Sequence, residues 1–173
     1  MRAALILAVT IAIACGGRSG APARSRPGTI AMTWTGKSRG SFMAPATARW
    51  CPADTLLEIL AVRSDTAVGL ALLARDSLRA ERYVVNESRN FTPGRPQANV
   101  ALRMLGDITL LGYDAMAGEV LVTQSGAMVS GSLEVRLRPV SGSDTLRMQG
   151  AFQRIPVSTA QGACGRANKP GGG

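Results

Sequence analysis

Strict alternation of apolar and polar residues dominates the second half of this sequence. Between Val129 and Leu137 every second residue is apolar or glycine, and the residues between them are serine, glutamate or arginine. Because successive side chains of a β-strand point to opposite faces of its sheet, this pattern predicts a strand with one buried and one solvated face. The alternation resumes from Leu146 to Phe152 after the turn-forming segment 139–144. The two segments together predict an antiparallel hairpin.

Shorter runs of the same kind recur along the chain. They cover residues 29–35, 56–63, 67–74, 82–86, 98–105, 107–113 and 119–124, with turn-forming clusters at 63–65, 92–94 and 117–118 between them. We therefore predict an all-β fold, a single antiparallel β-sandwich or barrel of about 8–10 short strands. Residues from Leu70 to Arg82 also favour a helix, because leucine, alanine, glutamate and arginine are good helix formers. One short helix in that segment stays open.

The length of 173 residues fits one domain of ordinary size. Residues 29–164 carry the strand-like pattern and are expected to form this β-rich domain. Residues 16–28 are rich in glycine, serine, proline and arginine, which predicts a flexible tether. Residues 165–173 are too poor in apolar groups to pack and are expected to form a disordered tail.

The N-terminus has the composition of an export signal. Met1 and Arg2 give a small positive start, and Ala3 to Ala14 form an apolar stretch of twelve residues. A membrane-spanning helix needs about 20 apolar residues, so the stretch is too short to cross a bilayer. We expect residues 1–14 to be a signal peptide that is removed.

The segment Ile11-Ala12-Ile13-Ala14-Cys15 resembles the lipobox of bacterial lipoprotein precursors, with a small residue directly before the cysteine. This resemblance implies that Cys15 receives a diacylglyceryl group and becomes the first residue of the mature chain, with residues 15–28 as anchor and tether. Gly16 stands where a retention aspartate would hold a lipoprotein in the inner membrane. The resemblance therefore implies the bacterial outer membrane, with the domain facing the periplasm or the cell surface. The alternative is an ordinary secretory signal in which Cys15 is incidental.

Cys51 and Cys164 remain as a pair once Cys15 carries lipid, and an exported location permits their oxidation. We predict a disulfide between them that fastens the C-terminal segment to an early strand. Closing such a long loop restricts the unfolded chain by roughly 4–5 kcal/mol. A redox or catalytic thiol is the alternative, but the sequence has neither a C-x-x-C spacing nor a histidine partner.

Several functional classes are excluded or disfavoured by composition. Histidine is absent, which excludes His-dependent triads and His-ligated metal or haem sites. The net charge of +9 is spread over scattered arginines without a basic stripe or stacking aromatics, so nucleic acid is not an expected partner. The carboxylate pairs Asp54/Glu58 and Asp107/Asp114 are ones that a glycosidase could use, but surface acids are far commoner than catalytic ones. We expect no catalysis, no metal and no cofactor.

Four aromatic residues are the candidates for lining a ligand pocket: Trp34, Phe42, Trp50 and Tyr113. A chain with only seven aromatics is expected to place most of them in its core instead. A lipocalin-like cup is the alternative, because an antiparallel barrel of about eight strands can hold one small ligand.

The sequence thus predicts a lipid-anchored domain of the cell envelope with a structural or interaction role. Its partners are expected to be the membrane, through the N-terminal lipid, and another envelope protein or an anionic surface polymer. A ligand-binding cup would show a lined apolar cavity, whereas an interaction protein would show a filled core and an exposed patch or sheet edge.

Overall fold

The computed structural model describes residues 26–85, 92, 94–106, 109–161 and 164. These ranges contain nine strands: β1 (Thr29–Gly36), β2 (Gly40–Cys51), β3 (Leu56–Arg63), β4 (Thr66–Leu73), β5 (Arg82–Val85), β6 (Gln97–Leu105), β7 (Leu110–Gln124), β8 (Met128–Pro139) and β9 (Leu146–Thr159). A single 3-10 turn, η1 (Pro52–Asp54), follows β2. The predicted all-β fold is confirmed. Residues 1–25 and 165–173, which hold the expected signal peptide, Cys15 and the tail, lie outside the described ranges.

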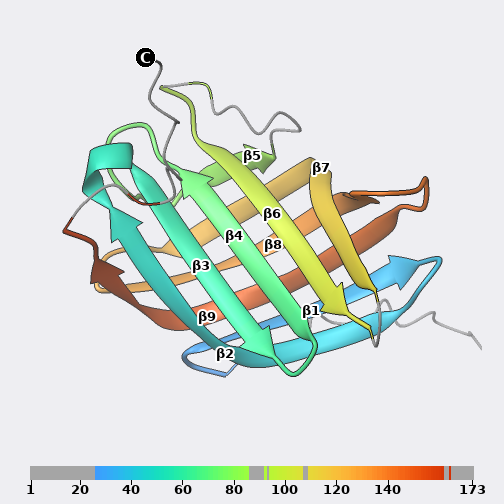
Figure 1. Ribbon diagram of the computed structural model, residues 1–173. Helices are drawn as coiled ribbons and strands as arrows, with labels where there is room; N and C mark the ends of the chain where they lie inside the picture. Colours follow the sequence, from blue (N-terminus) through green and yellow to red (C-terminus); the bar gives the residue numbers. More distant parts are fainter. Residues whose placement is uncertain (1–25, 86–91, 93, 107–108, 162–163, 165–173) are drawn as a thin grey trace, which may run out of the picture.

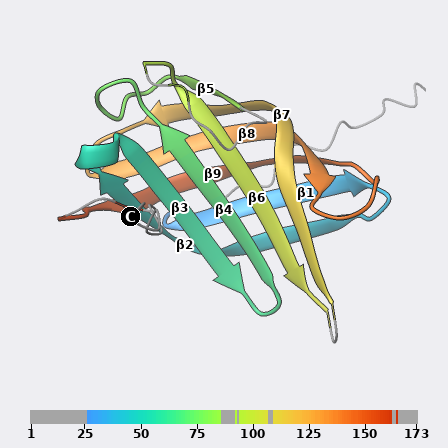
Figure 2. The ribbon, with the colours of Figure 1, turned by 45° about the horizontal axis from the view of Figure 1, so that its top comes forward.

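The strands form one sheet with mostly antiparallel pairing. Hydrogen-bonded neighbours follow the order β1-β2-β3-β4-β6-β5-β7-β8-β9, and β9 returns to pair with β1 along the whole of β1. β6 also pairs directly with β7 in an antiparallel ladder. Two short ladders are parallel, β2 with β9 and β5 with β6. Figures 1 and 2 show β3, β4 and β6 running across β7, β8 and β9, so that the two groups of strands face each other. Over the described part of the chain, no helix is long and apolar enough to cross a membrane.

The alternation in the sequence places the core as predicted. Val129, Leu133, Val135 and Leu137 of β8 are buried, while the polar residues between Leu133 and Leu137 are exposed. β8 and β9 form the predicted antiparallel hairpin, with Leu137 opposite Leu146. Period-two patterning therefore decided which face of these strands is covered.

Large interior side chains lie over glycines of the neighbouring strand. In the ladder Met32 is opposite Gly150, Phe152 opposite Gly131, and Trp34 opposite Gly40. A Cβ atom added to any of these glycines would overlap the side chain of its partner. The glycines thus provide the space that the large side chains fill, which couples the two strands of each pair.

β2 is a strand that the sequence reasoning did not assign. It contains Pro45, which has no backbone N–H to donate to a ladder. The ladder with β3 begins only at Ala46, and the Ala46 N–H points to the other side and donates to the Gly28 carbonyl oxygen at 3.0 Å. Pro45 therefore sits where a donor toward β3 is not needed, which is how a strand tolerates proline.

β7 is one long strand where the sequence suggested two strands and a turn. A register shift between Ala115 and Ala117 marks a β-bulge at Met116, in place of the expected turn at 117–118. Gly118 has a φ of 117°, and a Cβ there would overlap the backbone of Glu134. The segment 70–82, whose composition also favours a helix, contains the end of β4, an irregular connection and the first residue of β5.

Candidate functional site

The four aromatic candidates for a ligand pocket lie in or against the core. Trp34, Phe42 and Tyr113 are buried members of the hydrophobic core, with exposed fractions of 7%, 6% and 9%. Trp50 is partly buried and packs against the same core from the end of β2. The positions of these four aromatic side chains are therefore those of core packing residues.

The interior between the strands is filled around its large side chains. A side chain beside a cavity that can hold a water molecule would retain accessible surface. The exposed fraction is 0% for many interior residues contributed by strands on both sides of the core: Ile30, Met32, Leu57, Val68, Leu72, Val100, Leu102, Val120, Val129, Leu137, Met148 and Ile155. These residues therefore border no space of that size.

A disulfide joins Cys51 at the end of β2 to Cys164, 113 residues later, with a Cα–Cα distance of 5.8 Å. Both cysteines are buried. The Cys164 N–H donates to Asp54 Oδ2 at 2.8 Å, and the Ala160 N–H donates to the Trp50 carbonyl oxygen at 2.8 Å. The predicted bridge is present, and these hydrogen bonds help to hold the C-terminal segment against β2.

The same region contains the one group of possible metal ligands found among the described residues. A carboxylate oxygen of Glu58 lies within 4.8 Å of both cysteine sulfurs. The sulfurs are bonded to each other rather than present as thiolates, and Arg49 Nη2 donates to Glu58 Oε2 at 2.6 Å. Because thiolates are the cysteine form that binds metal, the two oxidised cysteines act here as a structural cross-link.

The acids of the two candidate carboxylate pairs also have structural partners where the structure describes them. Asp54 accepts a hydrogen bond from the Cys164 backbone and Glu58 is paired with Arg49, so both have structural partners. Asp114 forms an ion pair of 2.7 Å with Arg103. Asp107 lies outside the described residues. The described acids of these pairs thus hold neighbouring segments together.

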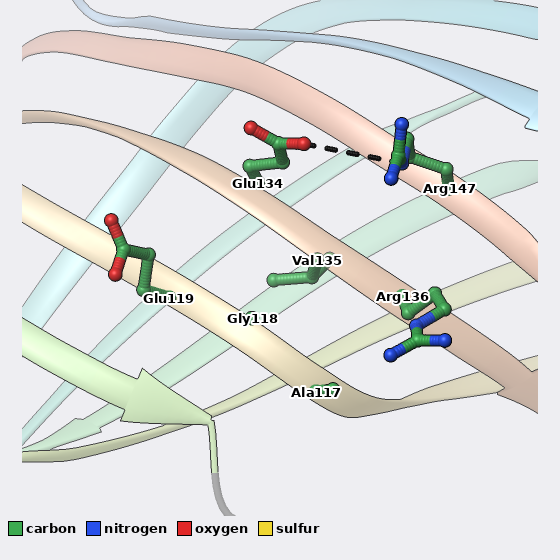
Figure 3. A pocket seen from close by; sticks show the side chains of 7 residues that line it. All are labelled: Ala117, Gly118, Glu119, Glu134, Val135, Arg136 and Arg147. Atoms are coloured by element: carbon green, nitrogen blue, oxygen red, sulfur yellow. Dashed lines mark ion pairs between the residues drawn. The ribbon is translucent and has the colours of Figure 1, made fainter.

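A shallow hollow lies on the outer face of β7, β8 and β9, where the bulge brings small residues to the surface (Figure 3). Its volume is ≈ 270 Å³, and its lining consists of Ala117, Gly118, Glu119, Glu134, Val135, Arg136 and Arg147. In Figure 3 the two acids lie toward one end of the hollow and the two arginines toward the other. The hollow is open to solvent, so any ligand would be held by charge and hydrogen bonds rather than by enclosure.

The charges around this hollow fall into two rows across the strands. Glu119 is directly opposite Glu134, and Arg136 is directly opposite Arg147. Like charges opposite each other on a sheet are unfavourable unless other charges offset them. Glu119 pairs with Arg82 at 3.1 Å, and Glu134 lies 3.9 Å from Arg147. Each acid therefore has a cation nearby.

A second surface feature is an apolar patch at the end of the β6–β7 hairpin. It consists of Leu105, Leu110, Leu111 and Val140, whose exposed fractions are 60%, 65%, 50% and 62%. Leu105 and Leu110 are cross-strand partners, and the Val140 N–H donates to the Gly112 carbonyl oxygen at 2.7 Å. Four large apolar side chains are thus exposed near this end of the hairpin, with those of the consecutive residues Leu110 and Leu111 on opposite faces of the strand. We call this region the apolar end.

Comparison of the chain with protein-family models, with curated proteins and with solved structures found no match.

The sequence reasoning did not single out the hollow or the apolar end. The sequence does contain a signal for the opposed arginines. Arg136 directly precedes Leu137, and Arg147 directly follows its hairpin partner Leu146. The register of that hairpin alone would have predicted the opposed arginines. The small residues of β7 beside them depend on the bulge.

Proposed function

We propose that this protein is an exported, lipid-anchored domain of the bacterial cell envelope with a structural or interaction role and without catalysis. The observation that carries the proposal is the Cys51–Cys164 disulfide. Disulfides of this kind persist in oxidising compartments, which supports export. It also leaves Cys15 as the odd cysteine, at the position where the lipobox resemblance requires a lipidated residue.

We propose further that the nine strands enclose a filled barrel rather than form a two-sheet sandwich. The pairing of β9 with β1 supports this architecture, because it joins the first and last strands of the order. Glycines opposite Met32, Phe152 and Trp34 let large side chains occupy the middle. A filled interior favours a surface that binds partners over a lipocalin-like cup.

The apolar end is the surface we propose for contact with another envelope protein. Large apolar side chains exposed near one end of a hairpin are typical of surfaces that bind another protein. The net charge of +9 favours an anionic surface polymer as a second partner. The lipid anchor would keep the domain at the membrane, since several acyl chains give stable anchoring where one alone is marginal.

Mass spectrometry of the mature N-terminus, purified from bacterial membranes, tests the anchor. We expect the first residue to be Cys15 carrying acyl groups. The variant Cys15→Ser should leave the domain folded and move it from the membrane to the soluble fraction, whereas Cys51→Ser should keep its lipid. An unmodified terminus at any other residue would refute the anchor.

A further inference from the structure

Arg136 has no acid at the positions paired with it on the two neighbouring strands. On the outer face of β8, Arg138 lies opposite Asp114 and Glu134 lies opposite Glu119. Arg136 instead faces Ala117 on β7 and Arg147 on β9. Among the described residues, none forms an ion pair with Arg136. Glu134, two residues away on the same face of β8, lies near Arg147 instead.

Arg147 is the second cation at this end of the hollow, and it is only loosely engaged. Its one ion pair with a described residue joins Arg147 Nε to Glu134 Oε1 over 3.9 Å, with side chains 70% and 65% exposed. Such long, exposed pairs contribute little to stability. The Arg147 guanidinium can therefore turn toward another anion at little cost.

The bulge in β7 leaves the space beside these arginines open. Ala117, the partner of Arg136 on β7, carries only a methyl group, and Gly118 next to it has no side chain. At the position paired with Arg136, β7 therefore carries only a methyl group. The hollow of ≈ 270 Å³ that results is large enough for a tetrahedral anion and part of the molecule that carries it.

We infer that this hollow binds a phosphate monoester group, with Arg136 and Arg147 as its two cationic arms. Cross-strand partners have Cα atoms about 4.5–5.5 Å apart, so two long arginine side chains can converge on one anion. Guanidinium groups form paired, charge-assisted hydrogen bonds to phosphate oxygens. A phosphate dianion matches the two guanidinium charges at this end of the hollow, whereas a carboxylate balances only one. The two acids that also line the hollow, Glu119 and Glu134, lie toward its other end. Bound phosphate would also remove the unfavourable contact between the opposed arginines.

This site is independent of the lipid anchor and of export, so its test does not depend on the proposed function. The full chain, in a nonionic detergent and at constant ionic strength, is titrated with glycerol 3-phosphate and with inorganic phosphate while backbone and arginine side-chain NMR signals are followed. We expect saturable shifts at Arg136, Arg147 and Ala117 with both probes. Acetate at the same concentrations should cause much smaller shifts at these positions.

Two variants separate this site from general attraction by a cationic protein. Arg136→Gln should weaken phosphate binding by about tenfold or more, equivalent to at least about 1.4 kcal/mol. Ala117→Glu places a carboxylate opposite Arg136, and it should abolish binding without lowering stability, because opposite charges across a ladder are favourable. Arg75→Gln is the matched control, since Arg75 is exposed in the connection from β4 to β5 and pairs with no described acid.

The outcomes decide the proposal in either direction. Equal loss of binding in Arg75→Gln and Arg136→Gln would show that net charge, and not the hollow, attracts phosphate. Unchanged binding in a folded Ala117→Glu variant would place the phosphate elsewhere. Shifts with acetate as large as those with phosphate would overturn the preference for a dianion. Loss confined to Arg136→Gln and Ala117→Glu supports the site.

Discussion

Removing the bridge between Cys51 and Cys164 should cost this domain a large part of its stability. The two cysteines are separated by 113 residues, so the bond closes a loop that spans most of the domain. In the chain-entropy treatment, a cross-link over a loop of this length restricts the unfolded chain by about 4.8 kcal/mol at 25 °C. Folded domains are commonly stable by only about 5–15 kcal/mol. The double variant Cys51→Ala/Cys164→Ala should therefore be marginally stable.

The same loss can be expressed as a change in melting temperature. The entropy of unfolding is about 2.1 cal/mol/K per residue, or about 0.3 kcal/mol/K for a domain of this size. A loss of 4.8 kcal/mol, about the value for such a loop, then corresponds to a decrease in Tm of about 16 °C. The Cys164 and Ala160 backbone hydrogen bonds to Asp54 and Trp50 do not require the bond between the sulfurs. The fold should survive its removal.

Urea unfolding followed by tryptophan fluorescence measures this effect in three samples: the oxidised protein, the reduced protein and the double variant. The reduced protein keeps both sulfurs in place, so its loss relative to the oxidised protein isolates the cross-link. The double variant adds the small cost of removing two buried sulfur atoms. A reduced protein whose free energy of unfolding stays within about 1 kcal/mol of the oxidised value would refute the entropic reasoning.

Three further changes test the packing and the charges. Gly150→Ala should lower the free energy of unfolding by about 2 kcal/mol or more through overpacking, whereas Gly69→Ala, whose Cβ meets no atom within 4 Å, should change urea midpoints little. Burial raises the pKa of Tyr83 to about 12. The folded state keeps this side chain neutral, so its contribution to the free energy of unfolding should be lost as the pH rises from about 10 to about 12. Tyr83→Phe should abolish this pH dependence, which alkaline unfolding followed by circular dichroism measures. A double-mutant cycle on Arg103 and Asp114, half-buried and 2.7 Å apart, should give a coupling of about 0.5–1 kcal/mol.

The sequence was sufficient to predict the strands in which apolar and polar residues alternate regularly. The β8–β9 hairpin follows from alternation on both sides of one turn-forming segment, and its register places Leu137 opposite Leu146. The bounds of β3, Leu56–Arg63, also agree with the prediction, although its leucine and alanine content suits a helix equally well. Pairing on both sides of β3 outweighed that local preference.

β2 could not be recognised from its own residues. Proline normally argues against a strand inside a sheet, and Pro45 stands within this one. The strand is tolerated because the ladder with β3 starts after Pro45, which is a property of the tertiary arrangement. The disulfide followed from counting cysteines, whereas the lipidation of Cys15 stays a prediction because the residue lies outside the described ranges.

The candidate phosphate site depends on the bulge in β7, which changes which residues of the strand point inward. The small residues Ala117 and Gly118 predict a turn there instead. Before the bulge the inward residues are Tyr113 and Ala115, and after it they are Val120 and Val122, so the inward positions change from odd to even numbers. If the alternation ran through Met116 without a bulge, Glu119 would point into the core. The bulge instead turns Glu119 outward and sets Ala117 opposite Arg136. A shift in apolar phase within one strand-like run is thus the sequence pattern that would have located this hollow, and the phosphate titration tests whether the bulge serves binding as well as packing.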